Sequence, residues 1–505
     1  MAGRLPGDQT HPCLALTPAG GYLVWEDNVT DGDGLGISAL KLNNTFSGEL
    51  GAFRVNGQSA GDQENPQVAM LKGGQVVFVW QGGTPGFQRV YVRFLDANGT
   101  FMTGDIPVGT PGNNAQVNPV VTGLVDGSAL VVWADVDQAS GMQDVFAQRF
   151  SAAGQPINSQ QINQYNLYNQ RTPAVAALPG GGFVAVWVSE QQRYDNSVDI
   201  YARLYDAAFE PLGSEFCINS SSNVCANPTV AAGNDGGFIV AWSQRFSQVP
   251  NLSSSSIVAG VPGGYTGRVM LDGSDAENGW EIYARAFDSQ STAIGQNIHV
   301  NSFTYGDQFA PRISARGTDY LVVWTSLGQD GSWEGVYGRF FNGAGVPEGD
   351  ESRVNTTIQN RQLHPALASD GDTRFLVAWS SFVDLTSSFD LFGQRFVSGP
   401  LAQSLPKPAA PFVSGLSSSR LSVSWPPMDG YAVDHYELFI NGPASPVQVT
   451  NNYYVAMQLV PGSTNSVQLR FQSVDGRVSP LSDPALGVTW GEDENMDGLP
   501  DDWQA

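Results

Sequence analysis

The sequence predicts an all-β protein of 505 residues, built from a large repeated domain and a smaller second domain. Glycine and proline supply 58 and 30 residues, which is too many helix breakers for a mostly helical chain. Short apolar runs that end in tryptophan recur at nearly constant spacing. Hydrophobic residues make up 41% of the chain, so a sizeable core can form and disorder is excluded.

The tryptophans define an internal repeat. Seven of them end an apolar run, at intervals of 55, 53, 54, 55, 82 and 55 residues. They are Trp25, Trp80, Trp133, Trp187, Trp242, Trp324 and Trp379. A proline lies 13 or 14 residues before each tryptophan, and in six repeats a glutamine lies three residues before that proline. The chain therefore contains seven copies of one unit.

Each unit contains four short runs with the character of β-strands. Turn residues separate the runs, such as Gly73-Gly74 and Gly236-Gly237 before the tryptophan strand. Four strands per unit of about 50 residues, repeated four to eight times, are typical of the blades of a β-propeller. We therefore predict a seven-bladed β-propeller with four-stranded blades over residues 1–400. The predicted repeats cover residues 9–60, 61–113, 114–167, 168–222, 223–305, 306–359 and 360–400.

Some segments of the repeats resemble a known group of proteins. Residues 181–187 (Gly-Gly-Phe-Val-Ala-Val-Trp), 200–203 (Ile-Tyr-Ala-Arg) and 213–219 (Gly-Ser-Glu-Phe-Cys-Ile-Asn) are similar to repeats of large secreted bacterial proteins that form seven-bladed propellers. The resemblance covers about residues 9–400 and implies the fold. It implies no activity, because that group has no single one.

A second domain follows the repeats. Residues 401–411 are rich in proline and are predicted to form a stiff linker. Apolar and polar residues then alternate around 421–425, 436–440 and 467–471, which predicts strands of a small β-sandwich over residues 412–490. Residues 473–482 resemble the last hairpin of a fibronectin type III domain, so a C-terminal fibronectin type III-like β-sandwich is expected.

The tail, residues 491–505, contains a calcium-type pattern. Oxygen-bearing residues alternate around Gly498, which permits the sharp turn of a Ca²⁺ loop. The segment resembles the start of a thrombospondin type 3 or dockerin-like calcium repeat, with Gln504 at the position of the last acidic ligand. The predicted Ca²⁺ ligands are Asp493, Asn495, Asp497, the carbonyl of Leu499, and Asp501. A solvated acidic tail is the alternative interpretation.

Charge and composition restrict the partners. The net charge of −24 repels phosphate backbones, so nucleic-acid binding is not expected. No apolar run reaches 18 residues, so no membrane span is expected. Few lysines and many Ser, Asn, Gln and Gly residues are typical of exported bacterial proteins. We expect a secreted or cell-surface protein whose signal peptide is absent from this chain.

One face of the propeller is predicted to carry the candidate binding residues. The turns before the first strand and those after the tryptophan strand lie on this face, which we call the loop face. Acids beside aromatic rings suit glycans or cations, although Asp and Gly are also ordinary turn residues. The candidate ligand-binding residues are Asp31, Asp33, Asp135, Asp137, Tyr194, Trp280, Asp330 and Trp333.

Two histidines are predicted to meet where the ring closes. His11 and His364 occupy the same repeat position in the first and last repeats, and we place them at the mouth of the central channel. A polar pair is the favoured interpretation, and a metal-binding or acid–base role is the alternative. The sequence contains no Gly-x-Ser-x-Gly elbow, His-Glu-x-x-His motif or phosphate loop, so no catalytic residue is assigned.

These observations favour an extracellular, non-catalytic binding or scaffold protein whose loop face engages a glycan or an extracellular protein. Enzymatic activity is left open but is not the favoured interpretation. The first alternative is a glycan-active enzyme, a glycosidase or lyase, that uses carboxylates of the loop face. The second is a structural subunit of a surface layer or filament, which would self-associate.

Overall fold

A computed structural model of the chain describes residues 7–49, 51–110, 112, 114–245, 279–384, 388–397, 405–428, 431, 433–442, 446–473, 478–492 and 500. Every regular element in these ranges is a β-strand. The chain divides into two compact units, Met1–Leu401 and Ala402–Ala505. Among the described residues, no helix is long and apolar enough to cross a membrane.

Unit 1 contains seven antiparallel sheets, which we call blades one to seven in chain order. Blade one consists of β1 (Gln9–Thr17), β2 (Gly20–Asp27), β3 (Gly36–Leu42) and β4 (Phe53–Arg54). Blade two consists of β5 (Gln63–Met70), β6 (Val76–Gly82), β7 (Arg89–Leu95) and β8 (Ile106–Pro107). Blade three consists of β9 (Ala115–Gly123), β10 (Ala129–Val136), β11 (Gln143–Phe150) and β12 (Pro156–Gln161). Blade four consists of β13 (Gln170–Ala177), β14 (Phe183–Glu190), β15 (Val198–Tyr205) and β16 (Phe216–Cys217).

The remaining blades follow the same order. Blade five consists of β17 (Val224–Ala232), β18 (Phe238–Arg245), β19 (Trp280–Phe287) and β20 (Ala293–His299). Blade six consists of β21 (Gln308–Arg316), β22 (Asp319–Leu327), β23 (Glu334–Asn342) and β24 (Ser352–Arg353). Blade seven shows β25 (Gln362–Ser369), β26 (Arg374–Asp384) and β27 (Ser388–Val397), and residues 398–404 lie outside the described part of the chain.

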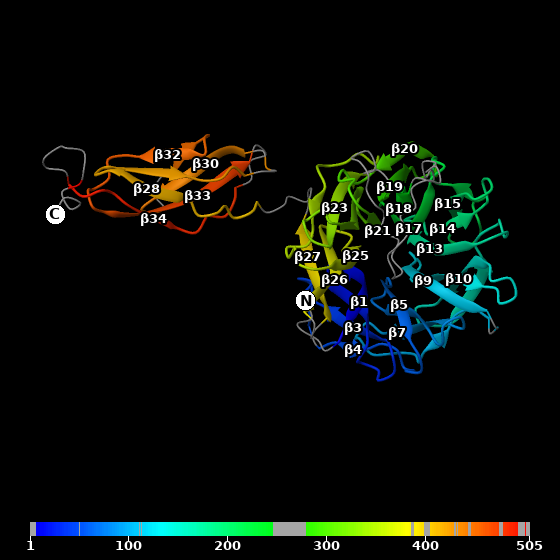
Figure 1. Ribbon diagram of the computed structural model, residues 1–505. Coiled ribbons are helices and arrows are strands. Elements are labelled where there is room, and N and C mark those ends of the chain that lie inside the picture. Colours follow the sequence, from blue (N-terminus) through cyan, green and yellow to red (C-terminus); the bar gives the residue numbers. More distant parts are fainter. Residues whose placement is uncertain are drawn as a thin grey trace, which may run out of the picture. The chain divides into compact units, whose positions relative to one another are not determined.

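The blades form a closed ring. The first strand of each blade contacts the first strand of the next, and β1 contacts β25. These seven inner strands surround the centre of unit 1 in Figure 1. At the closure, Arg374 Nη2 donates to the carbonyl of Pro18 at 3.0 Å and Arg395 Nη2 donates to the carbonyl of Phe46 at 3.3 Å. The predicted all-β propeller is therefore confirmed.

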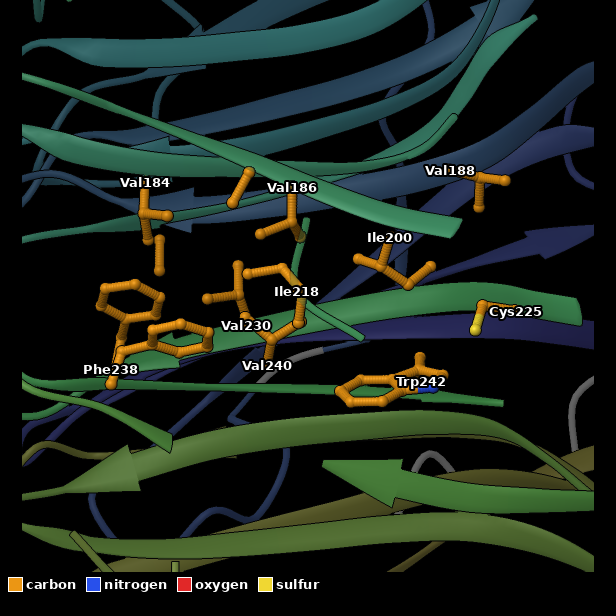
Figure 2. Close-up of a cluster of buried hydrophobic side chains, with 13 residues drawn as sticks. Val184, Val186, Val188, Ile200, Ile218, Cys225, Val230, Phe238, Val240 and Trp242 are labelled. Carbon is orange, nitrogen blue, oxygen red and sulfur yellow. The ribbon is translucent and has the colours of Figure 1, made fainter. Parts of the chain in front are cut away.

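Apolar side chains fill the space between neighbouring blades. Figure 2 shows the cluster between blades four and five, where Val184 and Val186 of β14 face Val240 and Trp242 of β18. All seven repeat tryptophans are at most 4% exposed. Their burial explains the strict spacing in the sequence, because each tryptophan must enter the same gap between two sheets.

Polar side chains also join neighbouring blades at repeated positions. An arginine on the third strand of one blade donates to a backbone carbonyl in the last strand segment of the preceding blade. The pairs, given as nitrogen-to-oxygen distances, are Arg93 Nη1–Val55 O at 2.6 Å, Arg203 Nη1–Ile162 O at 3.1 Å, Arg285 Nη1–Ile218 O at 2.7 Å and Arg339 Nη1–Val300 O at 3.1 Å.

Unit 2 is a β-sandwich of two antiparallel sheets. One sheet has the order β28 (Phe412–Ser417), β29 (Arg420–Ser424), β32 (Tyr453–Ala456). The other has the order β31 (Val447–Val449), β30 (Val433–Ile440), β33 (Thr464–Ser473), β34 (Ala485–Val488). Val423, Trp425, Leu438 and Phe471 are among its buried core residues, and Leu405 of the predicted linker packs against them. The alternation seen in the sequence therefore marks the inward faces of these strands.

Candidate site at the channel mouth

The seven inner strands share an irregularity at the same position. The pairing with the second strand shifts register around the repeat proline in every blade, as at a β-bulge. The residue before the proline has a positive φ of 49–54° in all seven blades, a conformation that non-glycine residues seldom adopt. We call this ring of residues the channel mouth: His11, Asn65, Asn118, Thr172, Asn227, Ala310 and His364. The repeated bulge sets these residues apart from the regular strand.

The structure brings His11 and His364 together. Their rings stack with centroids 3.9 Å apart and an angle of 22° between the planes. The two residues come from blades one and seven, so the contact forms only because the ring closes. The bulge also gives both residues the same backbone conformation.

A buried glutamate holds His11. His11 Nδ1 lies 2.7 Å from Oε2 of Glu26, which follows Trp25 on β2 and is 4% exposed. The other carboxylate oxygen, Oε1, accepts a hydrogen bond from the backbone N–H of Asn65 at 2.6 Å. Glu26 therefore joins blade one to blade two and also orients the imidazole of His11.

The position of Glu26 has a counterpart in blade two. Gln81 follows Trp80, and its Oε1 accepts from the backbone N–H of Asn118 at 2.8 Å. The amide of Gln81 thus makes the bond between blades that the carboxylate of Glu26 makes in blade one. In blade two Asn65 stands at the position of His11, so no histidine needs a carboxylate partner. The sequence offers one signal for Glu26: the residue after the repeat tryptophan is acidic in the first repeat alone.

The environment keeps His364 neutral. Burial, together with the smaller effects of the neighbouring His11 and Arg312 charges, lowers the pKa of His364 to about 3. His11 therefore stacks on a neutral imidazole. With Nδ1 on Glu26, the Nε2 atom is the nitrogen of His11 available to a ligand, and the His11 side chain is 45% exposed.

This arrangement can transfer protons. A carboxylate that orients one imidazole nitrogen fixes the tautomer, and the other nitrogen can then act as acid or base. Geometry within hydrogen-bond distance is the first requirement for such a role, and the contact of 2.7 Å meets it. The channel mouth is therefore the candidate site.

The predicted acidic residues of the loop face accept hydrogen bonds from other segments of the propeller. Asp31 Oδ2 accepts from Asn56 Nδ2 at 2.8 Å, and Asp330 Oδ2 accepts from Asn355 Nδ2 at 3.4 Å. Asp33 accepts from the backbone N–H of Gly61 at 3.2 Å. These bonds give each of the three carboxylates a partner within the fold, and the assignment of these acids to ligand binding stays a prediction.

The acids of blade three behave similarly. Asp135 accepts from Asn114 Nδ2 at 2.7 Å and from the indole Nε1 of Trp133 at 3.4 Å. Asp137 is exposed, and hydrogen bonds from the backbone and side chain of Ser140 hold its pKa below the usual value. Asp137 therefore stabilises the loop that follows β10, whereas Asp135 joins β10 to the segment before β9.

The predicted aromatic residues are spread over three blades. Tyr194 is 43% exposed, and its hydroxyl donates to the carbonyl of Ser222 at 3.0 Å. Trp333 is 58% exposed, with the Arg361 guanidinium 5.1 Å above its ring. Trp280 is half-buried and pairs with Arg245 across the strands of blade five. The eight loop-face candidates are therefore distributed over blades one, three, four, five and six.

The predicted calcium ligands Asp493, Asn495, Asp497, Leu499 and Asp501 lie outside the described residues. Within the described ranges, no group of three or more His, Cys, Asp or Glu side chains is placed to hold a metal ion.

Comparison with known proteins finds structural likeness. No family model and no curated protein matches the chain. A solved α-L-arabinanase of Penicillium chrysogenum with arabinobiose has 12% identity, covers 66% of this chain and 93% of its own, and gives a TM-score of 0.42. The GH93 α-L-arabinofuranosidase of Fusarium graminearum, also with arabinobiose, has 10% identity, the same two coverages and a TM-score of 0.44. A human fibronectin type III domain has 23% identity, covers 20% of this chain and 98% of its own, and gives a TM-score of 0.17.

These neighbours correct one expectation. The prediction of a non-catalytic binding or scaffold protein is wrong, because the named propeller neighbours are glycoside hydrolases. The same finding corrects the preference for a protein without enzymatic activity. Their identities of 10–12% relate this chain to them by fold.

Proposed function

We propose that this chain is a glycan-active enzyme, a glycosidase or lyase, in which His11 transfers a proton at the channel mouth. The observation that carries the proposal is the contact of 2.7 Å between the exposed His11 and the buried Glu26. In this proposal His11 is the catalytic residue, and Glu26 is a positioning residue that fixes its tautomer.

The surface chemistry supports a glycan as the substrate. Exposed rings such as Tyr194 and Trp333 can stack on the apolar C–H faces of sugars. The net charge of −24 disfavours a polyanionic substrate, so neutral glycans are the first class to test.

The test combines a glycan panel with variants that separate chemistry from folding. Purified full-length protein is incubated with neutral and uronate-containing polysaccharides. New reducing ends report cleavage of either kind, and ultraviolet absorbance of unsaturated products reports elimination. Glu26→Gln keeps an acceptor for the Asn65 N–H, as Gln81 does for Asn118, but removes the carboxylate partner of His11.

We expect His11→Ala and Glu26→Gln each to lower the turnover rate by about 10²-fold or more, the usual contribution of a general acid or base. The matched control is His299→Ala, because His299 also faces a carboxylate, with Nε2 3.3 Å from Glu281 Oε2, but lies on β20. Cleavage that survives in His11→Ala would contradict the assigned role.

Two finer assignments are part of the proposal. We infer that unit 2 is fibronectin type III-like, supported by its three-stranded and four-stranded sheets. We also infer that the protein works outside the cell, supported by its low lysine content and its acidic surface. Fractionation of the source cells, with detection of the chain in the medium or on the surface, tests the second point.

A further inference from the structure

Blade one differs from the other blades beside its tryptophan. In six blades an aromatic residue on the third strand lies directly opposite the repeat tryptophan. These pairs are Trp80–Tyr91, Trp133–Phe146, Trp187–Tyr201, Trp242–Tyr283, Trp324–Tyr337 and Trp379–Phe392. In blade one the residue opposite Trp25 is Ser38. Blade one therefore has a hydroxymethyl group where the others have a ring.

The replacement coincides with a cavity. A cavity of about 180 Å³ in blade one is lined by Gln9, Trp25, Asp27 and Ser38 at its buried end, and by Val29, Thr30 and Ala52, which are exposed. Because three lining residues reach the surface, the cavity opens to solvent.

Blade two supplies an internal comparison. The equivalent position is lined by Gln63, Trp80, Gly82 and Tyr91, and the cavity there is about 40 Å³. The ring of Tyr91 stacks on Trp80 with a centroid distance of 6.0 Å. An aromatic side chain at this position therefore occupies the space that lies beside Trp25 in blade one.

The buried end of the cavity offers an aromatic ring and polar groups. Gln9, Trp25, Asp27 and Ser38 are each at most 2% exposed. The indole Nε1 of Trp25 is buried and has no hydrogen-bond partner among the described residues. Burying such a donor without a partner costs about 1–3 kcal/mol, and the indole Nε1 of Trp324 in blade six is in the same state.

The carboxylate of Asp27 has capacity for one more bond. Its Oδ1 accepts from the backbone N–H groups of Val29 at 3.1 Å and Thr30 at 2.6 Å, and its Oδ2 accepts from Ser38 Oγ at 2.5 Å. An ionised carboxylate has about four acceptor positions, so one remains for a donor. The carboxylate of Asp27 can therefore accept a hydrogen bond from one ligand group.

We propose that this cavity binds one neutral sugar ring. An apolar cavity of about 150 Å³ is large enough for benzene, and the cavity in blade one measures about 180 Å³. A sugar ring has an apolar face for Trp25, and its hydroxyl groups both donate and accept. The buried carboxylate of Asp27 disfavours an anionic ligand. The site is separate from the proton transfer proposed for His11.

The experiment measures sugar binding to the full-length protein by saturation-transfer NMR and isothermal titration. The probes are the methyl glycosides of glucose, galactose, xylose and arabinose, with phenol as an aromatic probe of similar size. Ser38→Tyr places the blade-two side chain in the cavity, and Ser38→Ala is the matched control that leaves the space open. Ser38→Leu is a second filling variant for the case in which Ser38→Tyr does not fold.

We expect the wild type and Ser38→Ala to bind at least one of the sugars, and the filling variants to weaken that binding at least tenfold. His299→Ala should bind as the wild type does, and sugar binding is measured without turnover, so failure of the catalytic proposal remains distinguishable from failure of this one. The inference is overturned if none of the sugars binds, if phenol alone binds, or if a folded filling variant binds sugar as tightly as the wild type.

Discussion

Replacing Trp187 with alanine tests whether the gap between blades three and four is as tightly packed as the repeat pattern requires. Trp187 is fully buried, at 0% exposed. It packs against Leu130, Val132 and Ile162 of the preceding blade. Its indole Nε1 donates to Oε1 of the buried Gln170 at 3.2 Å.

Two losses set the size of the effect. Truncating a buried tryptophan to alanine costs about 3–5 kcal/mol, because the cavity collapses only in part. The Oε1 atom of Gln170 would also lose its donor, which adds about 1–3 kcal/mol for an unpaired buried group. Trp187→Ala should therefore lower the free energy of unfolding by at least about 4 kcal/mol, whereas Trp187→Phe should lose chiefly the hydrogen bond and some contact area.

Urea unfolding followed by tryptophan fluorescence and circular dichroism measures these losses. The control is Trp333→Ala, because Trp333 is 58% exposed and its removal should change the free energy of unfolding little. A loss of less than about 1 kcal/mol for Trp187→Ala would refute the packing argument, since large core truncations in packed proteins cost more than that.

Further predictions concern a buried amide, a histidine and the tail. The backbone N–H of Val145 donates to Asn163 Oδ1 at 2.7 Å, and Asn163→Ala removes this acceptor. The free energy of unfolding in urea should therefore fall by about 1–3 kcal/mol. Asn158→Ala is the control, because Asn158 is exposed on β12 and its loss should change the free energy of unfolding little. The fold lowers the pKa of His364 from 6.5 to about 3, so between these pH values the imidazole is protonated in the unfolded chain but neutral in the folded one. The free energy of unfolding should therefore fall as the pH drops from 6.5 to about 3. The loss should be smaller in His364→Gln, and identical pH profiles for the two proteins would contradict the lowered pKa. Calcium titration should give heat with the wild type that Asp497→Ala loses, and equal heats would assign calcium uptake to other acids.

Part of the candidate site was accessible from the sequence and part was not. His11 and His364 could be placed together because they share one repeat position in the first and last repeats. Glu26 was harder to find, since its importance depends on a contact across the strand pair with His11 and on a backbone bond to Asn65 of the next blade. The loop-face acids stay a prediction, because aspartate also accepts backbone hydrogen bonds in turns, as Asp31 and Asp137 do here.

The sequence alone determined the number of repeats, the four-strand unit and the second β domain. These properties depend on local periodicity, since each strand must alternate its side chains and each blade must bury one tryptophan in the same gap. The tertiary structure decided which residues meet. Ring closure stacks His11 on His364, and the pairing of β2 with β3 leaves Ser38 rather than a ring opposite Trp25. Such contacts depend on packing between segments distant in the chain, which a local pattern does not encode.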